Sequence, residues 1–598
     1  MEAPATQRSF LQRFADLNKG YWSSGNDDEW TRGRRWKVRF LVAALVVLTV
    51  GQVVVPVLVN LWSKHLFDAL EQHSMHDFLL MVAVIGGIIV FNVANTTLHL
   101  RVKRRLQIDW RQWMTKKLVR SWLARGRHFQ VTHLAGDHDN PDGRIAEDIR
   151  ITTEYVIDLA HSLLYCSMLL ISFTQILWTL SGAPEVTVLG LTFAVPGYLV
   201  YIALLYAAAG TTVAILLGRP LVRAVNRRQS YEADFRFGLG RVRENALSIA
   251  LLSAESAERR SMYDLLEGVM VGWNGQTRTL SNVTIFSSAY SVLSSAFPIL
   301  VVAPRYISGA ISLGALMQTA QAFQQMAAAL SWPVDNLGRV AECKASIERV
   351  LGLHDALAAL DREVLSTEKE HILVERTYET TSLSFHDLVV TEPDGRIVLD
   401  RFNAEIRPGE RVLIAGDPGA AIRLFRAVAG VWPWGSGRIS LPGNADSHPN
   451  RGKRAFFMPQ RPYLPRGPLR EVLSYPADSM AISDSDIGEA LERVGMGYLK
   501  SKLDKVAAWK EVLAMPEQQR LGFARLLIRR PDWIFVEDAT DALDPVGEEE
   551  MLRLLDLEFP NATLLTIGSH AGLDAHHSRK FMLNRTNSGV RMSEIPRP

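Results

Sequence analysis

The fold of the second half of the chain is decided at Gly416-Asp417-Pro418-Gly419-Ala420-Ala421-Ile422-Arg423. The apolar run Arg411 to Ala415 before it predicts a buried strand, and Leu424 to Gly430 after it predicts the first turns of a helix. A phosphate-binding loop has Gly-x-x-x-x-Gly-Lys-Ser/Thr between such a strand and such a helix, where bare backbone N–H groups surround the phosphates. Its place in the chain, with the glycines Gly416 and Gly419, therefore indicates a nucleotide site.

Three residues of this stretch lack the chemistry of the motif. Ala421, Ile422 and Arg423 stand where the motif has Gly, Lys and Ser or Thr. Ile422 removes the charge that reaches the outer phosphates, and Arg423 removes the hydroxyl that binds magnesium. Arg423 or Arg426 is an alternative phosphate-binding group, although a guanidinium one helical position further on points elsewhere. Taken alone, the stretch is also compatible with an ordinary strand-turn-helix connection.

The 598 residues are too many for one hydrophobic core and form two unlike halves. About the first 335 residues hold long uncharged runs, whereas the rest mixes charge, Pro and Gly as a soluble domain does. The formal net charge of +3 implies little about partners, and we expect no nucleic-acid partner. The two cysteines, Cys166 and Cys343, exclude a disulfide framework and show no metal-binding spacing.

The first half contains stretches long enough to cross a membrane as helices, which takes roughly 20 apolar residues. The longest includes an expected outer loop before Pro196. We expect six spans: Leu41 to Trp62, Phe78 to Leu98, Leu159 to Gly182, Val186 to Gly218, Thr279 to Pro304 and Tyr306 to Val334.

The distribution of Lys and Arg near the span ends predicts the orientation. Arg101 to Arg127 carries ten Lys or Arg, and Arg219 to Arg228 carries four, whereas the loops of opposite parity are nearly uncharged. We therefore expect the N-terminus, these basic segments and the C-terminal half to be cytoplasmic. Asn140 to Asp148 combines a turn signal with an acidic helix start, and we expect this segment to dock on another domain.

The second half repeats strand and turn signals in a fixed order after the opening stretch. Strand-like runs end in polar residues at Gln460, at Glu537-Asp538 and at Gly568-Ser569-His570. Between the first two, Leu513-Ala514-Met515-Pro516-Glu517 precedes a predicted helix, Leu521 to Arg530. No single motif in this series is specific, but their order is.

This order resembles the nucleotide-binding domain of ABC transporters, and after six spans the whole chain resembles a half-transporter of that superfamily. Further stretches resemble the SbmA/BacA-type group, which is related to peroxisomal ABC half-transporters: Asn140 to Asp148, Arg241 to Asn245, Gly430 to Gly437 and Pro459 to Pro465. The implied fold is an α-helical six-span membrane domain followed by an α/β P-loop NTPase-like domain. The implied domains are 1–40 (N-terminal segment), 41–335 (transmembrane), 336–375 (linker helix) and 376–598 (nucleotide-binding).

The resemblance implies catalytic positions that are altered here. Glu537-Asp538 reverses the family's Asp-Glu, which places Asp538 one methylene short of the attacking water as a base. Glu537 is the expected magnesium-binding position of the pair. Ser569 stands at the switch-histidine position, with His570 one place late. A surface role for His570 is the alternative interpretation.

The signature Leu-Ser-Gly-Gly-Gln/Glu, which closes over the partner's nucleotide, is also altered. Ala514 lacks its hydroxyl and Pro516 lacks a backbone N–H, whereas Glu517 is retained. Gln460, which in the family senses nucleotide and contacts the membrane domain, is retained as well.

The resemblance implies ATP and magnesium as cofactors and a homodimer or heterodimer of half-transporters in the inner membrane. Both composite half-sites are altered, so we expect impaired or absent ATP hydrolysis in a transporter of peptides or other bulky polar solutes. An ordinary ATP-driven transporter and a non-transporting regulatory partner of an intact half-transporter are the alternatives.

Overall fold

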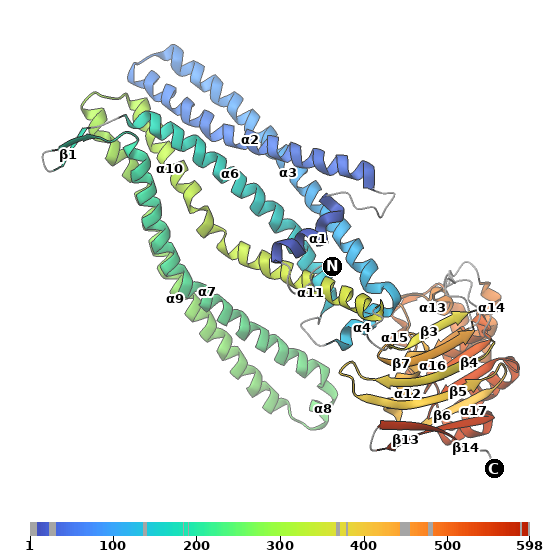
Figure 1. Cartoon of the computed structure of the whole chain (residues 1–598). Coiled ribbons are helices and arrows are strands. Elements are labelled where there is room, and N and C mark those ends of the chain that lie inside the picture. Colours follow the sequence, from blue (N-terminus) through green and yellow to red (C-terminus); the bar gives the residue numbers. More distant parts are fainter. Residues whose placement is uncertain are drawn as a thin grey trace. The chain divides into compact units, whose positions relative to one another are not determined.

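The computed structural model describes residues 9–22, 31–134, 140–182, 185–188, 191–365, 371–377, 381–442, 455–476, 482–586 and 589–595 (Figure 1). The chain forms two units. The helical unit comprises Met1–Lys117 and Asp142–Leu351, and the sheet unit comprises Leu118–Pro141 and Gly352–Pro598.

Long helices build the helical unit, because apolar backbone in a membrane must satisfy its hydrogen bonds within the helix. A short hairpin of β1 and β2 precedes α7, where the outer loop is predicted. The elements are α1 (Phe10–Trp22), α2 (Thr31–Glu71), α3 (Met75–Leu123), α5 (Pro141–Gly143), η4 (Arg144–Asp148), α6 (Ile149–Ser181), β1 (Glu185–Val188), β2 (Leu191–Ala194), α7 (Tyr198–Glu244), α8 (Ala246–Leu251), α9 (Glu255–Ile307), α10 (Leu313–Asp335) and α11 (Leu337–Leu365).

Five helices of the described chain are long and apolar enough to cross a membrane. They occupy Trp36–Glu71, Met75–His133, Pro141–Ser181, Tyr198–Glu244 and Glu255–Ile307. Each overlaps one of the first five predicted spans, but the fourth prediction, Val186 to Gly218, began too early, because the helix starts only at Tyr198. The chain is therefore a multi-pass membrane protein.

The sixth predicted span falls largely on α10, which is less apolar than the other five. It carries four glutamines, at 318, 321, 324 and 325. The helix begins at Ser312, whose hydroxyl accepts a hydrogen bond from the Ala315 N–H at 3.2 Å. α10 packs against α2, α6, α7 and α9, and Gln318 is buried. Packing among other helices explains why polar side chains are tolerated here.

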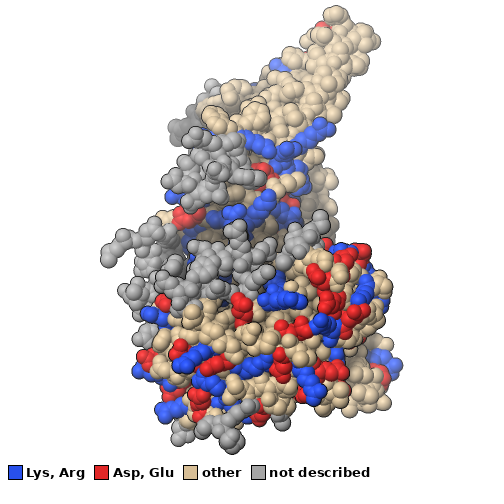
Figure 2. Space-filling model, turned by 90° about the vertical axis from the view of Figure 1, so that its right-hand side faces the viewer, with Lys and Arg blue, Asp and Glu red and all other residues tan. Residues whose placement is uncertain are grey.

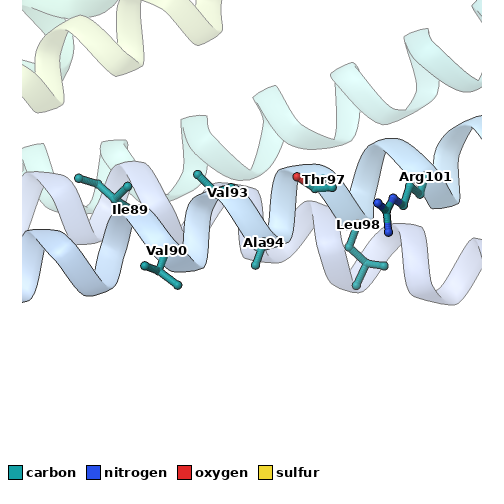
Figure 3. A pocket seen from close by; sticks show the side chains of 7 residues that line it. All are labelled: Ile89, Val90, Val93, Ala94, Thr97, Leu98 and Arg101. Atoms are coloured by element: carbon teal, nitrogen blue, oxygen red, sulfur yellow. The ribbon is translucent and has the colours of Figure 1, made fainter.

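One face of α3 presents an apolar stripe that ends in a charge. The side chains of Ile89, Val90, Val93, Ala94, Thr97 and Leu98 line a shallow groove, with Arg101 at its end (Figure 3). Arginines near the ends of membrane helices extend toward water. Arg101 therefore marks where this helix approaches the aqueous boundary.

A ten-stranded mixed sheet organises the sheet unit, in the order β3-β7-β4-β5-β14-β13-β6-β12-β11-β8. Its strands β13, β6, β12, β11 and β8 are parallel neighbours, so their carboxyl ends share one edge. The strands are β3 (Leu373–Thr377), β4 (Leu383–Thr391), β5 (Ile397–Ile406), β6 (Arg411–Gly416), β7 (Gly435–Pro442), β8 (Ala455–Met458), β11 (Trp533–Glu537), β12 (Thr563–Ile567), β13 (Arg579–Thr586) and β14 (Gly589–Ile595).

Helices and a second, two-stranded sheet, β9 with β10, complete this unit. Its largest apolar core lies around α13, α14 and α16, with Leu521 and Phe523 nearly inaccessible. Charged side chains of both signs alternate over its surface (Figure 2). The remaining elements are η2 (Ala124–Gly126), α4 (Arg127–Gln130), η3 (Val131–His133), α12 (Pro418–Val428), β9 (Gly467–Pro468), α13 (Leu469–Ser474), α14 (Asp484–Arg493), η6 (Gly497–Lys502), β10 (Val506–Ala507), α15 (Trp509–Val512), α16 (Met515–Arg529), α17 (Pro545–Glu558) and η7 (Ala571–His576).

Residues 124–133, here called the docking segment, pack against the turn before β7. The His133 ring lies 5.1 Å from that of Trp432, and Gln130 Nε2 donates to the Val431 carbonyl at 3.4 Å. In the predicted docking stretch Asn140 to Asp148, by contrast, Asp148 pairs with Arg349 at 2.6 Å within the helical unit. Residues 124–133 are thus held within the sheet unit, and the docking of Asn140 to Asp148 on another domain stays a prediction.

Candidate functional site

The β6–α12 turn contains the altered phosphate-loop residues. Gly416 has φ +112°, and a Cβ there would lie 2.3 Å from the Leu583 carbonyl oxygen, so only glycine fits. Asp417 follows as the N-cap of α12, and its carboxylate accepts from the Ala420 N–H at 3.0 Å. The sequence therefore retains the sharp strand-helix turn but caps the helix with its own anion.

The helix also begins earlier than predicted, at Pro418, which has no N–H to offer. Gly419 lies in its first turn, and the Ala421 N–H donates to the Asp417 carbonyl at 3.1 Å. Ala420 and Ala421 are both buried. The backbone N–H groups of Ala420 and Ala421 are thus both bonded to Asp417.

Two arginines neutralise carboxylates around this turn. Arg585 lies 3.0 Å from Asp417, and Arg423 lies 2.7 Å from Glu392. Arg423 also donates to the Gly419 carbonyl at 3.4 Å, whereas Ile422 beside it is half-buried. Arg423, which stands where the motif has a magnesium-binding hydroxyl, therefore forms an ion pair with Glu392 instead.

Arg426, one turn further along α12, faces Glu537 at the end of β11. Burial lowers the pKa of Arg426, and the Glu537 carboxylate opposes that shift. The guanidinium carbon lies 5.2 Å from the Phe129 ring and 5.9 Å from the Trp432 ring. Arg426 thus joins Glu537 electrostatically to the docking segment and to the turn that it contacts.

The carboxyl end of β11 presents Glu537 and Asp538. Burial raises the pKa of Glu537; Arg426 opposes the shift, and the neighbouring Asp538 charge adds to it. Burial also raises the pKa of Asp538, with a contribution from Asp541. Asp538 has φ +41° and its N–H donates to the Ile567 carbonyl at 2.9 Å. The pair forms a half-buried acidic site in which partial burial disfavours the ionised form of both carboxyls.

A hydrogen-bond network that the sequence analysis missed lies beside this pair. Gln460 Nε2 donates to Asp541 at 2.6 Å, and Gln519 Nε2 donates to Asp541 at 2.5 Å and to the Gln460 carbonyl at 3.1 Å. Asp541 follows Asp538 by three residues, and this closeness to the acidic pair was the available signal. The side-chain amide of Gln460 is therefore engaged in a hydrogen bond to Asp541 inside the sheet unit.

The signature positions form the N-terminus of α16. Ala514 is the N-cap, and Glu517 accepts from its N–H at 2.9 Å while also bonding Tyr498. That carboxylate and burial raise the pKa of Tyr498 to about 12. Pro516 occupies the first turn, where its missing N–H leaves no helical bond unmade.

The segment after β12 carries Ser569, which is exposed, and His570, whose Nδ1 lies 3.6 Å from Glu548. Since β6, β12 and β11 are parallel neighbours, Gly416, Ser569 and Glu537 lie along one edge of the sheet. Among the residues that the structure describes, no hydrogen bond or ion pair joins Ala514, Pro516 or Glu517 to that edge. The structure therefore assembles the loop, acidic and switch positions and keeps the signature apart.

His577 joins the segment after β12 to the sheet, and its burial predicts that the stability of β12 depends on pH. Its Nδ1 lies 2.6 Å from the Leu573 carbonyl and its Nε2 2.7 Å from the Thr566 hydroxyl, and burial lowers its pKa from 6.5 to about 4. Its contribution to stability is complete above pH 6.5 and is lost as the pH falls toward 4. We expect the free energy of opening of β12 to fall by about 1 to 2 kcal/mol between pH 6.5 and 5.

Hydrogen exchange of β12, corrected for the intrinsic pH dependence, measures this loss. His577→Gln is expected to remove the pH dependence, whereas His570→Gln, at a half-exposed histidine, is expected to retain it. Equal losses in wild type and His577→Gln would contradict the assignment.

Comparison with known proteins shows which sequences and structures this chain is similar to. Residues 33–307 match the family model described as ABC transporter transmembrane region 2. The uncharacterized ABC transporter ATP-binding protein sll0182 of Synechocystis sp. is 30% identical over 559 residues, covering 91% of this chain and 80% of that protein. The inner membrane ABC transporter ATP-binding protein YddA of Escherichia coli is 29% identical over 578 residues, with 95% and 97% covered.

A plant relative and a solved structure extend the comparison. ABC transporter D family member 2, chloroplastic, of Arabidopsis thaliana is 28% identical over 647 residues, with 96% of this chain and 86% of that protein covered. The structure of a bacterial Atm1-family ABC exporter with ATP bound has a TM-score of 0.66 at 18% identity, covering 93% of this chain and 95% of that chain. This structural likeness shows the fold.

Proposed function

Since the chain belongs to the ABC transporter family, as a half-transporter with relatives in the D family, we propose that it moves bulky polar solutes such as peptides across the inner membrane with little or no ATP hydrolysis. The inner-membrane location follows the printed name of the Escherichia coli relative. The cytoplasmic placement of the N-terminus and the nucleotide-binding domain follows the distribution of basic residues. The domain bounds 41–335, 336–375 and 376–598 are part of the proposal.

A polar interior in the helical unit supports a polar cargo. Asn60 Nδ2 donates to the Gln318 carbonyl at 2.9 Å, and Gln321 Nε2 donates to the Ser63 hydroxyl at 2.9 Å. These contacts join α2 to α10, which we propose as the sixth span. Polar side chains inside a membrane unit typically line solute pathways. The choice of peptides among polar cargoes rests on the sequence resemblance.

The capping of α12 by Asp417 is the observation that carries the proposal of impaired hydrolysis. A nucleotide phosphate needs free backbone donors, a lysine and a hydroxyl at this turn. The carboxylate of Asp417 bonds the Ala420 N–H, Ile422 and Arg423 replace the lysine and hydroxyl, and Glu392 pairs with Arg423. An added phosphate would meet two acids. ATP and magnesium therefore do not fit these residues in the way the motif requires.

The acidic edge supports the same conclusion. Arg426 offsets the charge of Glu537 without a metal ion, and the amide of Gln460 is bonded to Asp541. The composite sites of ABC dimers combine the loop of one subunit with the signature of the other. Because this chain is altered in both, neither a homodimer nor a heterodimer with an intact half-transporter would contain a complete site on this chain's residues.

ATP hydrolysis by the full chain in nanodiscs tests the proposal. We expect a rate at least about 100-fold below the roughly 1 s⁻¹ at the low end of typical enzymes. We also expect Asp538→Asn and wild type to be indistinguishable, because the residual activity would belong to contaminants.

Hydrolysis that disappears in Asp538→Asn would contradict the proposal and select an ordinary ATP-driven transporter. Co-purification with an intact half-transporter, together with no uptake by this chain alone, would select a regulatory subunit.

A further inference from the structure

Two histidines meet inside the helical unit, away from the nucleotide-site residues. The ring centroids of His99 on α3 and His161 on α6 lie 4.3 Å apart. His161 Nε2 lies 3.1 Å from Gln52 Oε1 on α2, so that nitrogen carries its hydrogen. Three helices thus contribute to one polar cluster.

His99 has an unused ring nitrogen. The side chain is 4% exposed, and its Nε2 has no hydrogen-bond partner in the described part of the chain. A buried polar atom without a partner costs about 1 to 3 kcal/mol. Such an atom in a native protein calls for an explanation, such as local strain, a chemical role or a bound water or ion.

Charged neighbours connect the pair to the helix surface. Lys103 Nζ lies 3.1 Å from Asp158, and Gln107 donates to the same carboxylate at 2.9 Å. Lys103 follows His99 by four residues and Asp158 precedes His161 by three, so each stands on the same helix face as its histidine. The other titratable groups that face the cluster are Glu154, with Arg104 and Arg150, and Tyr165.

The cluster lies where water is close. Arg101, two residues after His99 on α3, ends the apolar stripe of that helix (Figure 3). The side chains of Lys103 and Asp158 are 19% and 27% exposed, whereas His99 is enclosed. Asp158, one helical turn before His161, is therefore a carboxylate of this cluster that reaches water.

The ring nitrogens of His99 and His161 favour a proton over a metal ion as the ligand. The described residues contain no group of three His, Cys, Asp or Glu side chains that could hold a metal ion. A proton needs only one ring nitrogen, and two imidazolium rings this close repel each other. Electrostatic repulsion therefore limits the pair to one positive charge.

We propose that His99 and His161 form a binding site for a single proton, exchanged with water through Asp158. The proton leaves hydronium, resides briefly on the Asp158 carboxylate and forms an N–H bond at an imidazole nitrogen, with no redox step. Binding changes the hydrogen bonds that join α2, α3 and α6, so helix packing in the unit follows proton occupancy. The site stands whether or not the nucleotide site is active.

Solid-state NMR of the full chain, labelled with ¹⁵N-histidine in proteoliposomes, counts the protons. His99→Gln and His161→Gln assign the two signals, and His65→Gln, at an exposed histidine of α2, is the control. We expect both rings neutral at pH 8 and one proton shared by the pair at pH 4.5, with one protonatable histidine left in each single variant. Two imidazolium rings at pH 4.5, or none, would overturn the proposal, and the unchanged protein alone decides this.

The exchange route has its own test. We expect Asp158→Asn to slow exchange of the imidazolium hydrogen at least tenfold. Glu147→Gln, which removes a carboxylate that is 69% exposed near the same end of α6, is expected to leave the rate unchanged. Equal exchange in wild type and Asp158→Asn would exclude Asp158 as the route.

Discussion

Replacing Ile422 with Lys and Arg423 with Ser is expected to give weak ATP binding, and adding Asp417→Asn and Glu392→Gln to strengthen it at least tenfold. The first pair restores the missing lysine and hydroxyl. It also leaves Glu392 with only the more distant Arg396, at 4.0 Å, and Asp417 at the helix N-terminus, and both acids would repel a phosphate. Asn caps helices as well as Asp does, so the turn should survive. Labelled ATP binding to purified protein, with and without magnesium, measures the effect.

The unchanged protein is expected to show little magnesium-dependent binding. Asp394→Asn, at an exposed acid of the β4–β5 turn, is the matched control and should add nothing to the double variant. Tight binding by the unchanged protein would overturn the reading of this site as incompatible with nucleotide. A fourfold variant no better than the double variant would refute the blocking role of Asp417 and Glu392.

Trp432→Ala is expected to destabilise the sheet unit by about 3 to 5 kcal/mol and to release the docking segment. Trp432 is 1% exposed, and its Nε1 donates to the Thr391 carbonyl at 2.9 Å. The rings of Trp434 and His133 lie 4.9 Å and 5.1 Å from it. Removing the indole leaves a cavity and deletes the packing contacts of both β4 and the docking segment.

Hydrogen exchange separates the two effects of this change. Residues 124–133 should exchange faster in Trp432→Ala, and Trp432→Phe should recover most of the packing while losing the bond to Thr391. Tyr463→Ala, at a side chain that is 65% exposed in the same unit, is the control. Unchanged protection of the docking segment in Trp432→Ala would show that other contacts hold it.

Elements with strong local signals were predictable. Five of the apolar runs coincide wholly or largely with long helices, and the apolar run Arg411 to Ala415 forms β6, because both signals are local. α10 shows the limit of this reasoning. Its glutamines lower its hydropathy, and the helices packed around it compensate in a way that no window of sequence records.

Within the candidate site, the order of motifs predicted which strand ends lie together, but not their bonding. Asp417 reads as one variable residue of a loop motif, whereas in the fold it caps α12 and moves the helix start to Pro418. The pairing of Arg423 with Glu392 joins residues far apart in sequence. Likewise, the contact of His99 with His161 depends on helix register, which spacing alone does not fix.

The ion pair between Arg423 and Glu392 also bears on how the chain could change over generations. Replacing Arg423 alone would leave the Glu392 carboxylate, which is 13% exposed, with only Arg396 at 4.0 Å, at a cost of about 1 to 3 kcal/mol. Reverting Glu392 alone would strand the guanidinium. Each single replacement lowers the stability of the domain before any nucleotide could bind. A nucleotide site is therefore hard to regain by single substitutions once this ion pair is present.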